Sequence, residues 1–232
     1  MRSRLIGSNL FVVLSILLTA SVFLFPAYGV QAATYSWDPG TSGTWAWDTS
    51  TYNNWYNSIS NTDILWPNLT DSVADFGAGN LNGTITGGAV TVASGGVQAN
   101  AITFDIAGYS LSGGTITMSG TSPSITVATG ITETINSVIS GSAGLSTTGS
   151  LVLNGANNYT GITDIKSGYI TIGNDNAFGA AGAGNDIVVE SGGGIFNWLT
   201  RTIVNKALTL NGIGDGNNMA MHRRRRRIHL HQ

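Results

Sequence analysis

The chain has 232 residues, of which 9% are charged and 32 are glycine, against about 25% charged and about 7% glycine in average soluble proteins. Seven of the ten basic residues are Arg2, Arg4 and the arginines at 223–227, so the body between them carries three basic and twelve acidic residues, a formal charge of −9. This acidic body excludes nucleic acid as a partner, because phosphate binding requires clustered Lys and Arg. The lack of cysteine excludes disulfides, thiol catalysis and zinc–thiolate sites.

Residues 1–33 have the pattern of a secretory signal peptide, which we expect to form a signal helix. Arg2 and Arg4 give a positive start, residues 5–25 are mostly apolar, and small residues near 30–33 fit a cleavage site. The alternative is a membrane anchor, since the apolar stretch approaches spanning length. Polar residues within the stretch and Pro26 at its end favour cleavage. We therefore expect export, with membrane contact only through this segment before cleavage.

Residues 34–80 hold five of the six tryptophans and are predicted to form an N-terminal β cap. Trp45-Ala46-Trp47 alternates at strand period, which places both indoles on one face. Turn-forming sequences precede this segment at 38–40 and 41–43.

Two interpretations of these aromatic residues remain open. A stack of strands has an apolar end and unpaired edges, and large Trp side chains would cover that end. Alternatively, Trp45, Trp47 and Trp55 form a platform on which the sugar rings of an extracellular polysaccharide stack. We favour the cap, because covering the end is a requirement of such a fold. Whether Trp45 and Trp47 are buried or exposed distinguishes the two.

Residues 81–139 consist of short apolar runs separated by Gly, Ser or Asn, which is typical of short strands. The predicted strands are 84–86, 89–92, 101–104, 115–118 and 124–127. Comparable apolar runs recur about twenty residues apart, at Val127, Leu151 and Ile170, and repeats of that period stack instead of packing as a globule.

Residues 138–173 contain the most regular part of this pattern, with apolar runs at 151–153, 162–165 and 169–172. The segments Ser140–Leu145, Leu151–Gly161 and Ile170–Gly173 resemble the autotransporter-associated β-strand repeat, most closely at Asn157-Asn158-Tyr159-Thr160-Gly161. Two positions depart from that family: Ile162-Thr163 stands where Thr-Thr is usual, and Gly149 is followed directly by Ser150. The resemblance implies an all-β fold, a right-handed parallel β-helix (solenoid), on a bacterial cell surface or outside the cell. It implies no reaction.

We expect residues 81–218 as a whole to form this β-helix, with further strands at 186–190, 195–196 and 207–210. The composition changes abruptly at 219–232, which hold five consecutive arginines and all three histidines. This basic tail is a disordered segment, a basic arm for anionic polymers or a membrane surface, or the product of a changed reading frame near Asn218. The abruptness of the change favours the last interpretation.

No group of residues has the spacing of a catalytic or metal site. The pairs Asp71/Asp75 and Asp186/Glu190 are each four residues apart, which is about 13 Å along a strand and too far for the paired carboxylates of a glycoside hydrolase. The glycine- and aspartate-containing turn at 212–217 is a weak calcium pattern, because such turns bind calcium in series. We therefore predict no catalytic residue, no metal and no cofactor.

The predicted function is that of an exported, non-enzymatic, β-helical passenger-type protein. We expect a truncated fragment that acts as a surface stalk for adhesion or matrix contact. One alternative is a carbohydrate-binding module that uses the tryptophan cluster, and another is the remnant of a polysaccharide lyase or hydrolase. The expected partners are extracellular polysaccharide or other surface components.

Overall fold

A computed structural model describes residues 32–39, 45–77, 86–197, 200–212, 221–222 and 230–231. These residues form strands, turns and bends but no helix, so the described part of the chain is all-β. Accordingly, it holds no helix that is long and apolar enough to span a membrane. All of it belongs to one compact unit, Gln31–Gln232. The predicted leader lies outside the described residues, apart from Ala32 and Ala33.

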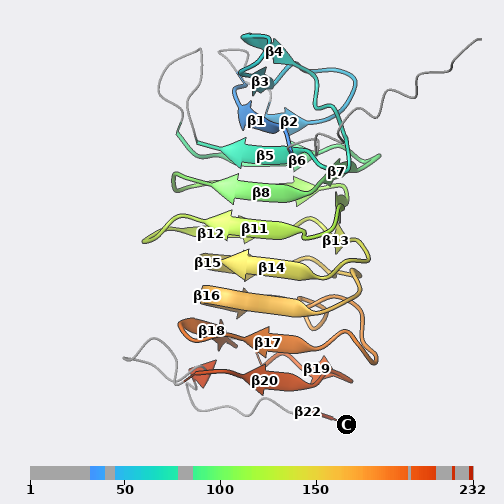
Figure 1. Cartoon of the computed structure of the whole chain (residues 1–232), viewed down its shortest axis with the longest axis vertical. Coiled ribbons are helices and arrows are strands. Elements are labelled where there is room, and N and C mark those ends of the chain that lie inside the picture. The colour runs from blue at the N-terminus through green and yellow to red at the C-terminus, as the bar shows by residue number, and fades with distance from the viewer. Residues whose placement is uncertain are drawn as a thin grey trace, which may run out of the picture. The chain divides into compact units, whose positions relative to one another are not determined.

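Most strand pairings are parallel and join strands from successive stretches of the chain (Figure 1). In the first series, each strand pairs with the next, and partners from β8 onward lie about twenty residues apart in the chain. The strands of the first series are β1 (Thr34–Trp37), β5 (Val73–Phe76), β8 (Ala101–Phe104), β11 (Ser124–Val127), β14 (Leu145–Thr148), β16 (Thr163–Ile172), β17 (Ile187–Val189) and β20 (Leu208–Leu210).

A second series of parallel pairings uses the strands that alternate with these in the chain. Its strands are β2 (Ala46–Trp47), β6 (Ala89–Val92), β9 (Ser110–Gly113), β12 (Thr132–Ile135), β15 (Ser150–Leu153), the second half of β16, β18 (Gly193–Phe196) and β21 (Met221–His222). Two shorter series are β7 (Val97–Ala99), β10 (Ile116–Met118) and β13 (Ile139–Ser140), and β19 (Ile203–Val204) with β22 (Leu230–His231). We use the term level for a stretch of chain that contributes one strand to each main series.

The antiparallel pairings of the described strands lie in the tryptophan-rich segment. Strand β3 (Trp55–Asn57) runs antiparallel to β1, and β4 (Thr62–Ile64) runs antiparallel to β3. Through β1, which is also parallel to β5, this small antiparallel extension joins the first parallel series at its N-terminal end. The pairing pattern thus changes character within the segment predicted to be a cap.

Alternation of apolar and polar side chains builds the interior. In β11, Ile125 and Val127 are buried, whereas Ser124 and Thr126 are partly exposed. The in-register partners of Val90 in the second series are Leu111 and then Ile135, so buried aliphatic side chains follow one another from level to level. Each such burial stabilises the fold by about 1.5–3 kcal/mol.

The Asn-x-Tyr-x-Gly segment that resembles the repeat connects three levels through buried polar groups. The side chain of Asn157 accepts a hydrogen bond from the N–H of Ile139 (2.8 Å) and donates one to the carbonyl of Ala177 (2.7 Å). The hydroxyl of Tyr159, also buried, is 2.7 Å from that of Thr163. Because buried polar groups destabilise a fold unless they are hydrogen-bonded, these residue types are required where the chain turns between strands.

The structure differs from the sequence-based prediction in several places, and strands such as β14 were not predicted. The strands predicted at 162–165 and 169–172 form one ten-residue strand, β16, which pairs with β14 through its first half and with β15 through its second. In the basic tail, the described residues form the two-residue strands β21 and β22. Three predicted segments lie outside the described residues: the remainder of the tail, most of the strand at 84–86, and the turn at 212–217 except Gly212.

Candidate functional site

The tryptophan cluster is a buried core within the N-terminal segment. Trp47 and Trp55 are 0% exposed, and their ring centroids are 5.1 Å apart. Trp66 packs at 4.5 Å from Trp55, and its indole N–H donates to the carbonyl of Gln98 at 2.9 Å. Trp45 keeps part of its surface exposed, and its ring lies over Gly88 and 6.2 Å from the ring of Tyr109.

This arrangement bears on the residues suggested for glycan stacking. Trp47 and Trp55 present no ring face to solvent, whereas Trp45 retains part of its surface. Stacking of a sugar on Trp47 or Trp55 would require the cluster to open. Burial therefore favours the cap interpretation, and glycan stacking in this cluster stays a prediction that rests on Trp45.

Acidic side chains that could have served in catalysis instead accept hydrogen bonds from neighbouring segments of the chain. Asp186 accepts the N–H of Ala207 at 2.9 Å, and Glu190 accepts the side-chain amide of Asn211 at 3.1 Å. Asp175 likewise accepts a hydrogen bond from a backbone N–H, that of Thr202. Among the described residues, no three His, Cys, Asp or Glu side chains gather as they would around a metal ion. A remnant lyase or hydrolase activity stays a hypothesis.

Glu133 is a buried carboxylate that the sequence reasoning missed. It is 1% exposed, one of its oxygens accepts the N–H of Gly108 at 2.9 Å, and the other has no hydrogen-bond partner. Burial raises the pKa of Glu133, although the N–H groups of Gly108 and Tyr109 oppose this effect. Burial, with Glu133 and Asp75 nearby, also raises the pKa of the Tyr109 hydroxyl. The alternation in Thr132-Glu133-Thr134-Ile135 could have identified this buried carboxylate, because Glu133 lies on the same inward side of the strand as Ile135.

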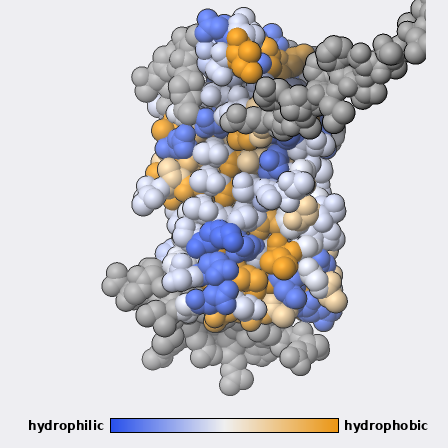
Figure 2. Space-filling view, viewed as in Figure 1, coloured by the Kyte–Doolittle hydropathy of each residue, from blue (hydrophilic) through white to orange (hydrophobic). Residues whose placement is uncertain are grey.

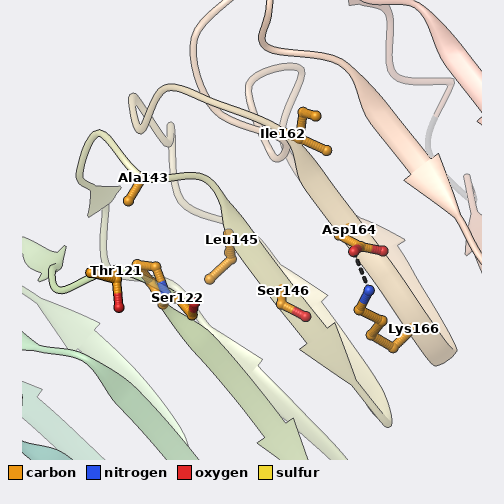
Figure 3. Close-up of a pocket in the computed structure, with 9 residues that line it drawn as sticks. Thr121, Ser122, Ala143, Leu145, Ser146, Ile162, Asp164 and Lys166 are labelled. Atoms are coloured by element: carbon orange, nitrogen blue, oxygen red, sulfur yellow. Dashed lines mark ion pairs between the residues drawn. The ribbon is translucent and has the colours of Figure 1, made fainter.

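A groove of about 380 Å³ opens on the outer surface beside β11, β14 and β16 (Figure 3). Hydroxyl groups and apolar side chains both line it, among them Thr121, Ser122, Pro123, Leu145, Ser146 and Ile162. At one end, the ammonium of Lys166 forms an ion pair with Asp164, which raises the pKa of Lys166. Figure 2 shows hydrophilic side chains next to hydrophobic ones at the height of β14 to β17. This groove is the candidate binding site.

Comparison with known proteins gives one informative similarity. Over 158 residues, the chain is 34% identical to the "Adhesin BmaC autotransporter" of Brucella suis biovar 1 (strain 1330). The aligned part covers 67% of this chain, and the chain spans 4% of the length of that curated relative. No family model matches the sequence, and no solved structure matches it. The chain is thus similar to an autotransporter protein, without assignment to a particular repeat family.

Proposed function

We propose that the chain is part of the exported, surface-exposed region of an autotransporter-type adhesin, and that it folds as a right-handed parallel β-helix. In this proposal, the signal peptide directs export, and the levels form a non-enzymatic stalk whose outer surface contacts cells or matrix. The tryptophan cluster covers the N-terminal end of the stalk.

The proposal rests on two observations taken together: the parallel pairing of successive strands and the sequence similarity to an adhesin. Two series of parallel strands follow one another in chain order, with buried Ile, Val and Leu side chains in successive levels. That topology is compatible with a β-helix, and the chain is 34% identical over 158 residues to a protein described as an adhesin. The low charge and abundant Gly suit stacked strands that are joined mainly by backbone hydrogen bonds.

Attachment of coated beads tests the adhesive function. Fluorescent beads that carry the full chain should adhere to epithelial cells or to deposited extracellular matrix more strongly than beads that carry the heat-unfolded chain. Antibodies against the chain should also label intact bacteria that express it, and external protease should remove the label. Equal attachment of the two kinds of bead would contradict an adhesive role, and protection from protease would contradict surface exposure.

A carbohydrate site at the tryptophan cluster is a second candidate, and the partial exposure of Trp45 is the observation that favours it. Replacement of Trp45 by Ala should abolish glycan binding if that ring is the platform. Replacement of the buried Trp47 by Phe serves as the matched control, because it keeps an aromatic side chain in the core. Unchanged binding after Trp45→Ala, in a chain that still melts cooperatively, would exclude this candidate.

A further inference from the structure

The groove beside β14 and β16 has the size and position of a small-ligand site. Its volume of about 380 Å³ falls within the range of about 300–1,000 Å³ that is typical of such sites. Three successive levels contribute to it, through the turn before β11, through β14, and through the start of β16 (Figure 3). Within it, Ser146 and Asp164 are in-register partners on neighbouring strands.

An irregularity in β16 sets the position of Lys166. Thr147 of β14 is paired with Ile165, but the next residue, Thr148, is paired with Ser167, so Lys166 is an extra residue on β16. Such a bulge re-aims a side chain and is common next to functional sites. Here it lies where β16 passes from the first series to the second, and Lys166 forms its ion pair with Asp164 at the edge of the groove.

The chemistry of the groove matches a ligand that has both hydroxyl groups and an apolar face. The carboxylate of Asp164 can accept hydrogen bonds, the ammonium of Lys166 can donate them, and the Ser146 hydroxyl can do either. Ile162, which is 49% exposed, adds an apolar surface at the opposite end of the groove (Figure 3). Sugars combine these two properties in one ring.

The charges around the groove determine which sugars suit it. Lys166 is the cation of the groove, and its charge is already balanced by Asp164, while Glu190 acts on it as a second carboxylate. An anionic sugar would therefore meet two carboxylates for one ammonium. We propose that this groove binds a neutral oligosaccharide, with Asp164 and Lys166 as its polar clamp and Ile162 as its apolar contact. The proposal rests on the proposed adhesive function, to which it adds a ligand class and a location.

Titration of the full chain with defined oligosaccharides tests the proposal. The neutral probes are cellohexaose, chitohexaose and maltohexaose, the anionic probe is hexagalacturonate, and binding is followed by calorimetry. At least one neutral probe should bind, and Asp164→Asn, Lys166→Met and Ile162→Gln should each weaken its binding about tenfold or more. Thr126→Ala is the matched control, because Thr126 lies on the outer side of β11 and is not part of the groove. It should leave binding unchanged.

Several outcomes would overturn the proposal. These are binding of hexagalacturonate alone, binding of a peptide but of no sugar, and neutral-sugar binding that survives all three groove variants or is lost with Trp45→Ala. Thermal melting of each variant separates loss of the site from loss of the fold. The bead assay separates the two proposals: if the groove variants adhere as well as the native chain, the groove proposal fails while the adhesive function stands. If the chain binds a sugar but its beads do not adhere, the groove proposal stands and the adhesive function fails.

Discussion

The carboxylate of Glu133 accepts a hydrogen bond from the backbone N–H of Gly108 at 2.9 Å, across two neighbouring levels. Glu133 thus occupies an interior position in a strand whose other inward side chain is Ile135. Burial raises the pKa of Glu133 above its ordinary value of 4.5, so the folded chain holds this proton more tightly than the unfolded chain does. The free energy of unfolding contributed by Glu133 is therefore largest below the unfolded pKa and falls as the pH rises through the folded pKa.

Replacement of Glu133 by Gln should flatten this pH dependence, because the amide does not titrate. Differential scanning calorimetry between about pH 4 and about pH 8 measures it as the slope of Tm against pH. Glu190→Gln is the matched control for the loss of one carboxylate, since Glu190 lies on the outer surface next to Asn211. Identical slopes for the native chain and for Glu133→Gln would contradict the prediction.

Replacement of the buried Asn157 by Ala should destabilise the chain by about 2–4 kcal/mol, because it leaves the N–H of Ile139 and the carbonyl of Ala177 without their partner. The adjacent Asn158 has an exposed side chain, so Asn158→Ala should change stability by less than about 0.5 kcal/mol. Urea unfolding of the two variants measures the difference. A similar loss in both would mean that the amide of Asn157 does not connect the levels.

Two glycines with nearly the same backbone conformation allow steric crowding to be separated from strain. Gly130 has φ 87° with open space where a Cβ would lie, whereas Gly149 has φ 86° and a Cβ there would collide with the carbonyl oxygen of Val127. Gly130→Ala should cost about 1–2 kcal/mol, the strain of a left-handed residue. Gly149→Ala should cost about 1–3 kcal/mol more, because the collision forces neighbouring backbone to move. Equal losses in urea unfolding would contradict the close approach at Gly149.

Replacement of Lys206 by Met should loosen the segment between β16 and β17. The ammonium of Lys206 donates to the carbonyls of Ala180 (2.7 Å) and Asn185 (2.5 Å). Burial lowers the pKa of Lys206, which offsets part of the stabilisation, so we expect a net loss of about 1–3 kcal/mol. Hydrogen exchange should accelerate at 180–186. The control is Lys166→Met, which removes an exposed ion pair and should leave stability almost unchanged. Faster exchange at 180–186 in this variant as well would contradict the role given to Lys206.

Local pattern was sufficient to predict the strands in which apolar and polar residues alternate. The strand predicted at 124–127 has the same bounds in the structure, because Ile125 and Val127 face inward between polar neighbours. Strand β14 was missed because one of its two inward residues, Thr147, is polar yet buried. A single apolar residue, Leu145, then gives too weak an alternation to identify a strand.

The candidate site could not be predicted in the same way, because it depends on contacts between levels. Neighbouring positions in the groove, Ser146 and Asp164, come together only through the register of β14 against β16. The exposure of Lys166 depends further on a bulge within that register. The tryptophans were recognised as a group from composition. The burial of Trp47 and Trp55, however, depends on how β1, β3 and the neighbouring strands pack together.

In-register pairing between successive levels also constrains how a gene for such a chain can change in length. Loss of one residue inside a strand would exchange its inward and outward side chains, so that aliphatic groups would meet water and hydroxyls would meet the interior. Duplication or removal of a complete level instead leaves every remaining strand with a suitable partner, because each level contacts only its neighbours. Length variation among relatives of this chain should therefore occur in whole levels, with smaller insertions confined to the turns.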